Sequence, residues 1–417
     1  MSFIPTKFFM ENKERIVRSI KDKDLDLFKT LLSEIAENSL ELTTFSDLNN
    51  REFNHTSIDE TIFDRIPITG LTLLHIASRY NSLECFKFIH EDKKIPLKIL
   101  SENKLIPLQY ACFYGSTDVA LYILNEDPDE CKYHDDEKSI FSVLYCATIG
   151  GKIEIMQELF NKGAQLTDPW NDQYMILNKA IALFNDIFEF LYPKRSPDFT
   201  TPPERPPLAI CAIIDHNLKA LEIVYNKETD LTYHYTGAKG YRSFIEHILT
   251  SRDLRFKDFL IKILTDAKDI SFEPPETPGQ LQEGVCHWVC SYCDVDVANL
   301  MFKTKDVNIN RYDQHHKRGA DYLIVNKDRK KATEMLQCLI ENGFNINQRF
   351  DNNSPSLLQD FLCGISKNYE AIELLIKYGA DVNAPIIKRN VIQFPSIIQY
   401  VMNQQDKRMK RIFNIQE

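Results

Sequence analysis

The sequence has little of what marks several common protein classes. Glycine occurs only 13 times in 417 residues, and no glycine-rich stretch has the pattern of a phosphate-binding loop. No apolar run approaches the ~20 residues needed to cross a bilayer. The first ten residues lack the apolar core of a signal peptide, and the acidic Glu11 follows them at once. We therefore expect neither a P-loop enzyme nor a membrane-inserted protein, and we place the chain in the cytoplasm or nucleus.

An excess of positive charge is also missing. Lys and Arg number 50 against 60 Asp and Glu, which gives a formal net charge of −10. Such a chain repels nucleic acid and anionic lipid unless one face is locally basic, so no nucleic-acid partner is expected. Hydrophobic residues make up 43%, which excludes a mainly disordered chain. At this length the chain must form several domains or a stack of small repeated units.

A repeat period organises most of the chain. Small residues recur at Ala77, Ala111, Ala147, Ala180 and Cys211, with steps of 34, 36, 33 and 31 residues. The first three are the last residues of the segments LLHIA, LQYA and VLYCA. Each is then followed by a second apolar stretch with spacings of three and four residues, which is the pattern of a helical hairpin.

The ends of the units are also alike. Gly163, Gly343 and Gly379 follow the second apolar stretch, where a left-handed helix cap favours glycine. Residues 379–383 read GADVN. With the starts described above, this ending resembles the ankyrin-repeat family, whose units begin T-P-L-H-x-A and close G-A-D-x-N. The resemblance implies an all-α ankyrin-repeat solenoid of stacked helix-turn-helix units with β-turn or finger loops. We expect ten such units from Pro67 to Glu417.

Composition predicts how the chain is divided. The predicted segments, in chain order, are a degenerate helical cap at 1–37, a polar linker at 38–66, the best-formed repeats at 67–192, a proline-rich loop at 193–207, divergent repeats at 208–271, a second proline-rich loop at 272–281, and repeats with a C-terminal cap at 282–417.

One cysteine cluster raises the question of chemistry. Cys286, Cys290 and Cys293 have the C-x3-C-x2-C spacing that resembles the iron–sulfur motif of radical-SAM enzymes. His315 and His316 could add ligands for zinc, although nothing in the sequence fixes their geometry.

We favour a structural interpretation of these cysteines. Spacings of four and three residues place Cys286, Cys290 and Cys293 on one stripe of a helix, where cysteine packs as a small hydrophobe. Cys290 and Cys211 are predicted to hold the position that alanine holds in other units. The sequence therefore predicts no metal, no cofactor and no catalytic residue.

The predicted binding surface follows from the family register. The resemblance implies that residues just after the repeated alanine face a concave groove. Here these are Arg79, Tyr80, Phe113 and Tyr114. Aromatic and arginine side chains are frequent energetic anchors of interfaces, although these aromatic rings could also only pack on adjacent units.

An acidic loop adds to this surface. Residues 127–137 hold six carboxylates, among them Asp135, Asp136 and Glu137. A run of this kind is usually a solvated loop. As a finger beside a groove it would attract a basic segment of a partner.

Together these features predict a non-catalytic scaffold that binds a partner protein through the groove and finger loops. Two alternatives stay open. The chain could recruit substrates for a larger modifying or ligase complex, or it could be an iron–sulfur enzyme through the cysteine cluster.

Overall fold

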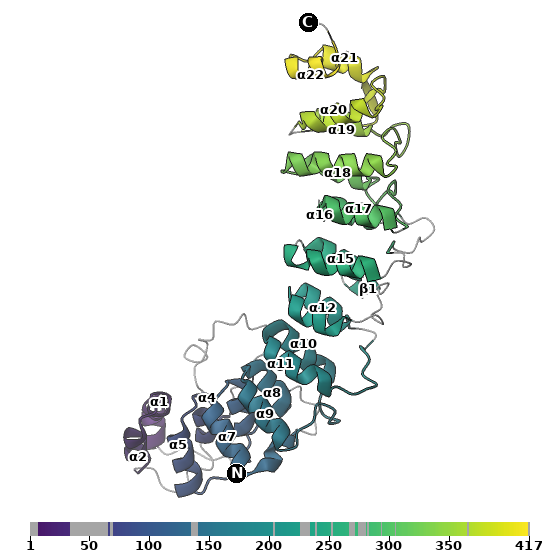
Figure 1. The fold of residues 1–417 in the computed structure, drawn as a ribbon. Helices are drawn as coiled ribbons and strands as arrows, with labels where there is room; N and C mark the ends of the chain where they lie inside the picture. The colour runs from purple at the N-terminus through teal and green to yellow at the C-terminus, as the bar shows by residue number, and fades with distance from the viewer. Residues whose placement is uncertain are drawn as a thin grey trace. The chain divides into compact units, whose positions relative to one another are not determined.

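The computed structural model describes most of the chain. The described residues are 7–33, 66, 70–134, 141–202, 205–225, 234–237, 240–251, 253–266, 272–273, 281, 283–292, 294–304, 306–364 and 367–415. They form two compact units, Met1–Ile223 and Val224–Glu417, referred to below as unit 1 and unit 2. Each unit is a stack of helical hairpins (Figure 1).

All described elements of unit 1 are helical. In chain order they are α1 (Lys7–Lys21), α2 (Leu25–Ser33), α4 (Leu73–Arg79), α5 (Leu83–Lys87), the π-helix η3 (Phe88–Asp92), α6 (Pro107–Phe113), α7 (Thr117–Glu126), the 3₁₀ helix η4 (Pro128–Lys132), α8 (Val143–Gly150), α9 (Ile153–Asn161), α10 (Gln173–Leu183), α11 (Asn185–Leu191), η5 (Tyr192–Lys194), α12 (Leu208–Ile214) and, at the boundary, α13 (Leu218–Val224).

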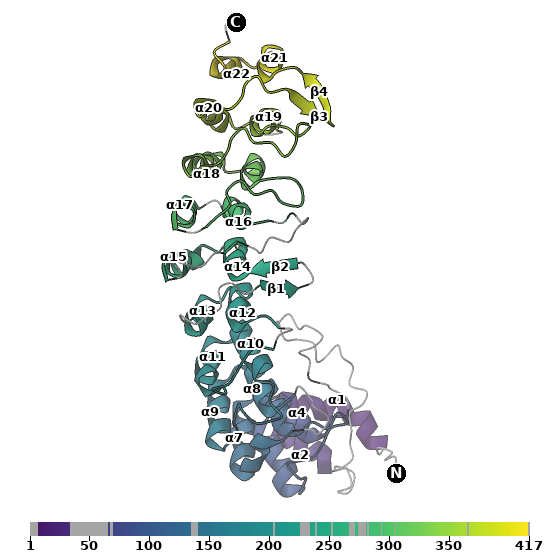
Figure 2. The same cartoon turned by 90° about the vertical axis from the view of Figure 1, so that its right-hand side faces the viewer.

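The helices of unit 1 lie in two layers. The first helix of each hairpin packs on the first helix of the next, in the order α4, α6, α8, α10 and α12. The second helices α5, α7, α9 and α11 form the other layer. Figure 2 shows the two layers side by side, with α9 and α11 on one side of α8 and α10. A hairpin of two short helices cannot bury its own apolar face, so the neighbouring hairpins supply that cover.

The N-terminal pair α1 and α2 continues this stack. The two helices pack on each other, α1 on α4 and α2 on α5. Their buried side chains include Ile16, Ile20, Phe28 and Leu32. The chain turns between the helices at Lys23, whose φ is 57°.

Unit 2 adds two short β hairpins to the helical stack. In chain order its elements are β1 (His234–Gly237), β2 (Gly240–Ser243), α14 (Phe244–Ser251), η6 (Leu254–Phe256), α15 (Lys257–Asp266), α16 (Val285–Tyr292), α17 (Val295–Thr304), the 3₁₀ helix η7 (Gly319–Val325), α18 (Arg329–Glu341), α19 (Leu357–Cys363), α20 (Tyr369–Lys377), β3 (Ile386–Lys388), β4 (Val391–Phe394), α21 (Ile397–Met402) and α22 (Lys407–Ile412).

The strands described in unit 2 form two antiparallel pairs, β1 with β2 and β3 with β4. Each precedes a first helix, α14 and α21, and contacts it. In Figure 2 both β hairpins lie on the side of unit 2 that also carries the loops between successive helical hairpins.

One side chain near the start of several first helices ties a hairpin to the next one. The His75 Nδ1 atom accepts a hydrogen bond from the Thr72 N–H at 3.1 Å. The other ring nitrogen, Nε2, therefore carries the proton and donates to the Leu105 carbonyl oxygen at 2.9 Å. Burial lowers the pKa of His75 to about 4, so the ring is neutral when it makes both bonds.

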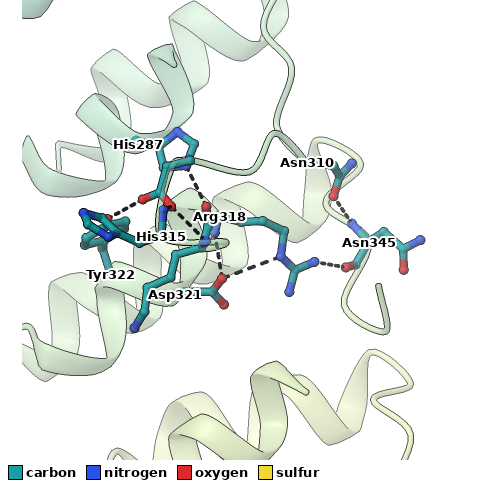
Figure 3. Close-up of polar contacts among 9 residues, drawn as sticks. His287, Asn310, His315, Arg318, Asp321, Tyr322 and Asn345 are labelled. Carbon is teal, nitrogen blue, oxygen red and sulfur yellow. Dashed lines mark hydrogen bonds and ion pairs between the residues drawn. The ribbon is translucent and has the colours of Figure 1, made fainter. Parts of the chain in front are cut away.

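Other residues make the same two hydrogen bonds at the equivalent position of other hairpins. Gln109 accepts from the Ile106 N–H at 2.8 Å and donates to the Phe141 carbonyl. In unit 2, His287 accepts from the Gly284 N–H and its ring pairs with the Lys317 carbonyl at 3.0 Å (Figure 3). An imidazole and a primary amide both offer one acceptor and one donor, which is why either residue type suffices.

In the helix η7, two residues together make the bond to the helix start and the bond to the next loop. Asp321 accepts from the Arg318 N–H at 2.7 Å, but a carboxylate has no proton to donate to the next unit. Arg318 supplies the missing link, because its Nη1 donates to the Asn345 carbonyl at 2.8 Å. Figure 3 shows Arg318 between Asp321 and Asn345. The guanidinium is buried and lies 3.8 Å from the Asp321 carboxylate.

Asparagines join the loops of unit 2. The Asn310 side chain accepts from the Asn345 N–H at 2.8 Å and donates to the Gly343 carbonyl at 3.3 Å. Asn347 accepts in the same way from the Asp381 N–H at 2.8 Å. Each of these two asparagine amides therefore bonds to the backbone of the following loop, through its oxygen as acceptor and its nitrogen as donor.

The helix caps correct one prediction about register. Counted from the cap, the position of Ala77 is held by Ala212 in α12 and by Val289 in α16. The prediction that Cys211 and Cys290 hold this position is wrong by one residue in each case. The loops between units vary in length, so distance along the chain does not fix where a helix begins, whereas the cap bond does.

Candidate protein-binding surface

Two adjacent helix ends bring four predicted residues together. Helices α4 and α6 pack side by side, and each ends at a tyrosine, Tyr80 and Tyr114. The backbone N–H of each tyrosine still bonds within its helix, Tyr80 to the Ile76 carbonyl at 3.2 Å and Tyr114 to the Tyr110 carbonyl at 3.0 Å. The residue before each tyrosine, Arg79 or Phe113, therefore belongs to the rigid last turn.

The four side chains contact one another. The Arg79 guanidinium lies 4.5 Å from the centre of the Tyr114 ring and 5.7 Å from that of Tyr80. The Phe113 and Tyr114 rings meet edge to face, with centres 5.2 Å apart and planes at 69°. All four residues are half-buried, so each packs on its neighbours and still presents part of its surface. We call Arg79, Tyr80, Phe113 and Tyr114 the aromatic patch.

The neighbourhood of the aromatic patch extends to the N-terminal helices. The Lys21 ammonium lies 6.0 Å from the centre of the Tyr80 ring. The Ser116 hydroxyl donates to the Arg79 carbonyl at 3.3 Å and so links the two helix ends through the backbone. Each exposed cation–π contact contributes only about 0.5–1 kcal/mol, so these contacts orient the side chains more than they stabilise the fold.

A buried pair supports the aromatic patch from below. Tyr110 and His75 are both buried, and their rings meet edge to face with centres 5.1 Å apart. Because His75 is also bonded to the backbone at both nitrogens, the platform under the patch is rigid.

The aromatic patch ends at the third hairpin because no side chain fits there. Gly150 takes the place of Tyr114 in α8, and a Cβ atom at Gly150 would lie 1.9 Å from the Cys112 carbonyl oxygen. The close approach of α8 to α6 therefore requires glycine at this position. The sequence alone did not indicate this limit.

The acidic loop is only partly described. Asp135, Asp136 and Glu137 lie outside the described residues, so their predicted role stays a prediction. In the part that precedes them, the Lys98 ammonium pairs with Asp127 at 3.0 Å. Glu130 is fully buried, and neither of its carboxylate oxygens accepts a hydrogen bond from any residue that the structure describes. Burial, helped by the nearby Asp127 charge, raises the pKa of Glu130 to about 8, so this residue adds little negative charge at neutral pH.

Sequence reasoning missed two stacked ring pairs on the loops. The His134 and Trp170 rings stack with centres 4.3 Å apart, and the His316 and Phe350 rings with centres 3.9 Å apart. In each pair the partners come from consecutive loops of one unit. The only signal in the sequence is the recurrence of a ring 36 or 34 residues after a histidine.

The cysteines of the predicted cluster lie in a packed helix. Cys286 and Cys290 are buried in α16, while Cys293 lies outside the described residues. A Cβ atom at Gly319 would lie 2.7 Å from the Cys286 sulfur, so α16 and η7 meet closely at this thiol. Within the described ranges, no three His, Cys, Asp or Glu residues are grouped as metal ligands would be. The His316 ring instead stacks on Phe350, and His315 donates its backbone N–H to Asp313 at 2.7 Å.

None of the helices in the described ranges is both long enough and apolar enough to span a bilayer.

Comparison with known proteins bears on the repeats. Residues 16–136 match the family profile described as ankyrin repeats, in three copies. Among solved structures, the chain is similar to the human ASB11 ankyrin repeat domain, with 12% identity over 66% of this chain and 99% of that one and a TM-score of 0.38. A search of curated proteins finds no match.

The family match runs from Ile16, within α1, through η4 and includes all four residues of the aromatic patch. Beyond it, stacked helical hairpins are found in both units, and in unit 2 His287 and Gln359 make the same kind of side-chain link as His75. Residues 16–136 therefore carry ankyrin repeats, and the described helices form an all-α solenoid fold.

Proposed function

We propose that this protein binds a partner protein through the aromatic patch and that it has no catalytic role in that complex. Ankyrin repeats generally mediate protein–protein interaction, and the matched repeats are the ones that carry the patch. The observation that carries the proposal is the Arg79 guanidinium held against the Tyr114 ring, with both side chains half-buried.

The chemistry of the aromatic patch favours a particular kind of partner group. The positive charge of the Arg79 guanidinium lies beside the aromatic rings, where it favours an acidic side chain of a partner. Tyr80 and Phe113 supply apolar area on either side. A partner segment with an acidic residue beside an apolar one fits this arrangement.

Rigidity would raise the affinity. The helix ends that carry the patch are fixed by Ser116 and by the buried pair of His75 and Tyr110. Side chains that are already ordered lose little conformational entropy when a partner binds. The acidic residues Asp135, Asp136 and Glu137 are proposed as a second contact, for a basic segment of the same partner.

The test is quantitative affinity capture with the tagged full-length chain. Proteins captured by the wild type are compared with those captured by the double variant Arg79→Ala/Tyr114→Ala. We expect at least one specific partner to fall by tenfold or more in the variant. Equal recovery with both chains contradicts the proposal.

A matched control removes the same chemistry elsewhere. Lys377 lies 5.5 Å from the centre of the Tyr378 ring on α20, which makes a cation–tyrosine pair in unit 2. The variant Lys377→Ala/Tyr378→Ala should capture the same partner as the wild type. Circular dichroism and thermal melting of both variants separate loss of binding from loss of folding.

A further inference from the structure

A second, independent surface lies on the β hairpin of unit 2. Strands β3 and β4 pair through Ile387 with Ile392 and Lys388 with Val391. The connecting residues Arg389 and Asn390 have φ of 51° and 61°. Two successive left-handed residues form the two-residue turn that closes a tight hairpin.

This turn decides which backbone groups face outward. In a two-residue hairpin, the pair next to the turn, Lys388 and Val391, exchanges both hydrogen bonds. The next pair, Ile387 and Ile392, therefore directs its N–H and C=O groups away from each other, toward the two outer edges of the hairpin.

One outer edge is closed by a side chain. The Gln359 amide oxygen accepts from the Ile387 N–H at 2.9 Å, and the Gln359 amide nitrogen donates to the Ile387 carbonyl. The amide of Gln359 thus makes the two bonds that a neighbouring strand would make to β3.

The other outer edge is open. In the described part of the chain, no residue bonds to the outward N–H and C=O groups of Ile392. The side chains around them are apolar and accessible, with Val391 57% and Ile392 62% exposed. Exposed edge strands usually carry charges or proline that discourage pairing, whereas β4 has three accessible residues without charge before Pro395 ends it.

The charge around the hairpin is of one sign. Residues 384–405 contain Lys388 and Arg389 and not one Asp or Glu, although the chain holds 60 acidic residues. Both cations are exposed at the turn of the hairpin. The open edge therefore lies beside a local positive charge on a chain whose net charge is negative.

We propose that β4 binds an extended segment of a partner protein by strand addition, with an acidic side chain of that segment placed beside Lys388 and Arg389. The partner backbone would bond to Ile392 as Gln359 bonds to Ile387. Its apolar side chains would cover Val391 and Ile392. Main-chain bonds supply part of the affinity in this mode, and side-chain pockets and charges supply the specificity.

Charge complementarity favours this occupant over a second copy of the chain. Two copies paired through β4 would gain no charge complementarity, because residues 384–405 of the second copy hold Lys388 and Arg389 and no Asp or Glu. An acidic partner segment gains from the same two cations.

The test begins with a displayed library of random linear ten-residue peptides selected on the full-length chain. We expect the enriched peptides to alternate apolar and polar residues and to carry Asp or Glu near one end. The best peptide is then measured by fluorescence polarisation. We expect Lys388→Glu/Arg389→Glu to weaken its binding tenfold or more, while the control Lys330→Glu/Lys331→Glu on α18 leaves it unchanged.

A change in the probe tests the backbone bonds without altering the protein. N-methylation of the peptide at the residues that face β4 should abolish binding, and N-methylation at the alternate residues should not. On the protein side, Ile392→Lys removes apolar contact and Ile392→Pro removes the outward N–H. Both should weaken binding at least fivefold, with circular dichroism confirming that each variant folds.

Three results overturn the proposal. The selection could yield no binder, or its binders could be insensitive to both the N-methyl scan and the hairpin variants. Sedimentation could instead reveal a dimer that Ile392→Pro dissolves, which would assign the edge to a second copy. None of these results affects the aromatic patch, because the variant that tests it, Arg79→Ala/Tyr114→Ala, changes residues in unit 1 only.

Discussion

The two units build the same stack with different polar links. In unit 1 the links described above are neutral side chains that bond to backbone carbonyls, from His75 and Gln109, and the accessible helix ends carry aromatic rings. In unit 2 charged pairs join the links, with the buried Arg318 beside Asp321 and Arg311 beside Glu273 at 3.3 Å. The family match lies wholly within unit 1. Helical hairpins of the same kind therefore stack with polar links made by different residue types.

The comparison can be tested unit by unit, because the chain has two tryptophans and each unit holds one. Trp170 lies in unit 1 and Trp288 in unit 2. Trp288→Phe leaves a fluorescence signal that follows unit 1, and Trp170→Phe leaves one that follows unit 2. The predictions below use these two backgrounds.

The largest effect is expected from the buried arginine of unit 2. Arg318→Ala removes the bond to Asn345 and leaves Asp321 buried without its cation, which should cost unit 2 about 3–5 kcal/mol of unfolding free energy. Urea unfolding followed by Trp288 fluorescence measures this loss. The double variant Arg318→Ala/Asp321→Ala should recover part of it, since no charge is then left alone. An equal loss in both variants would show that the ion pair does not matter.

A smaller loss is expected in unit 1 from the equivalent position. His75→Ala removes two backbone bonds and a buried ring, which should cost about 2–4 kcal/mol. His75→Gln should cost much less, because glutamine makes the same two bonds at Gln109. The Trp170 signal reports both variants. If His75→Gln were as unstable as His75→Ala, the exchange of residue types proposed for this link would be wrong.

The same histidine predicts a pH dependence. The folded-state pKa of His75, about 4, lies below the unfolded value near 6.5, so protons bind the unfolded chain more tightly. The contribution of the neutral His75 ring to the unfolding free energy is complete above pH 6.5 and is lost as pH falls from 6.5 to 4. The His75→Gln variant should lack this loss, which unfolding curves at pH 7 and pH 5 can measure.

A buried acid in unit 1 acts in the opposite direction. The pKa of Glu130 is raised to about 8 in the folded chain, so ionisation favours the unfolded state as pH rises from about 4.5 to 8. Glu130→Gln should remove this dependence and stabilise unit 1 by roughly 1–3 kcal/mol at pH 7.5 relative to pH 5. The difference between the two pH values is the measurement, because it cancels any fixed effect of the amide. A variant whose stability keeps the wild-type pH slope contradicts the assignment.

The smallest effect is expected from the asparagines that join the loops. Asn347→Ala removes a bond to the Asp381 N–H and one to the Gly379 carbonyl, at 2.8 and 2.9 Å, on an exposed loop. Unit 2 should lose about 1–2 kcal/mol. Asn352→Ala, on a neighbouring exposed turn, should change stability by less than about 0.5 kcal/mol. Equal effects from the two would remove the asparagine links from the account.

Much of the fold could be predicted from the sequence. The repeat period, the hairpins and the ankyrin resemblance rest on apolar spacing, which burial enforces directly. The glycines after the second helices were also predicted, and Gly163, Gly343 and Gly379 have φ of 100°, 96° and 89°. These features depend on residues that are close together in the sequence, so the sequence pattern is enough to predict them.

The features that the sequence did not reveal depend on contacts between successive helical hairpins. Asp321 cannot donate a hydrogen bond to the next loop, and Arg318 makes that bond to Asn345 instead. No rule of sequence spacing links those three positions. The outer edge of β3 is closed by the bond between Gln359 and Ile387, which are 28 residues apart, and this leaves β4 as the open edge. The sequence did bring Arg79 and Tyr114 together as candidates, but their contact and the limit of the patch at Gly150 needed the packing of adjacent helices.

The most direct test of the central claim is hydrogen exchange of the full-length chain with and without the partner that the capture experiment identifies. The account predicts slower amide exchange at the ends of α4 and α6, around Tyr80 and Tyr114, when the partner is bound. Protection confined to other helices, with these two helix ends unchanged, would contradict it.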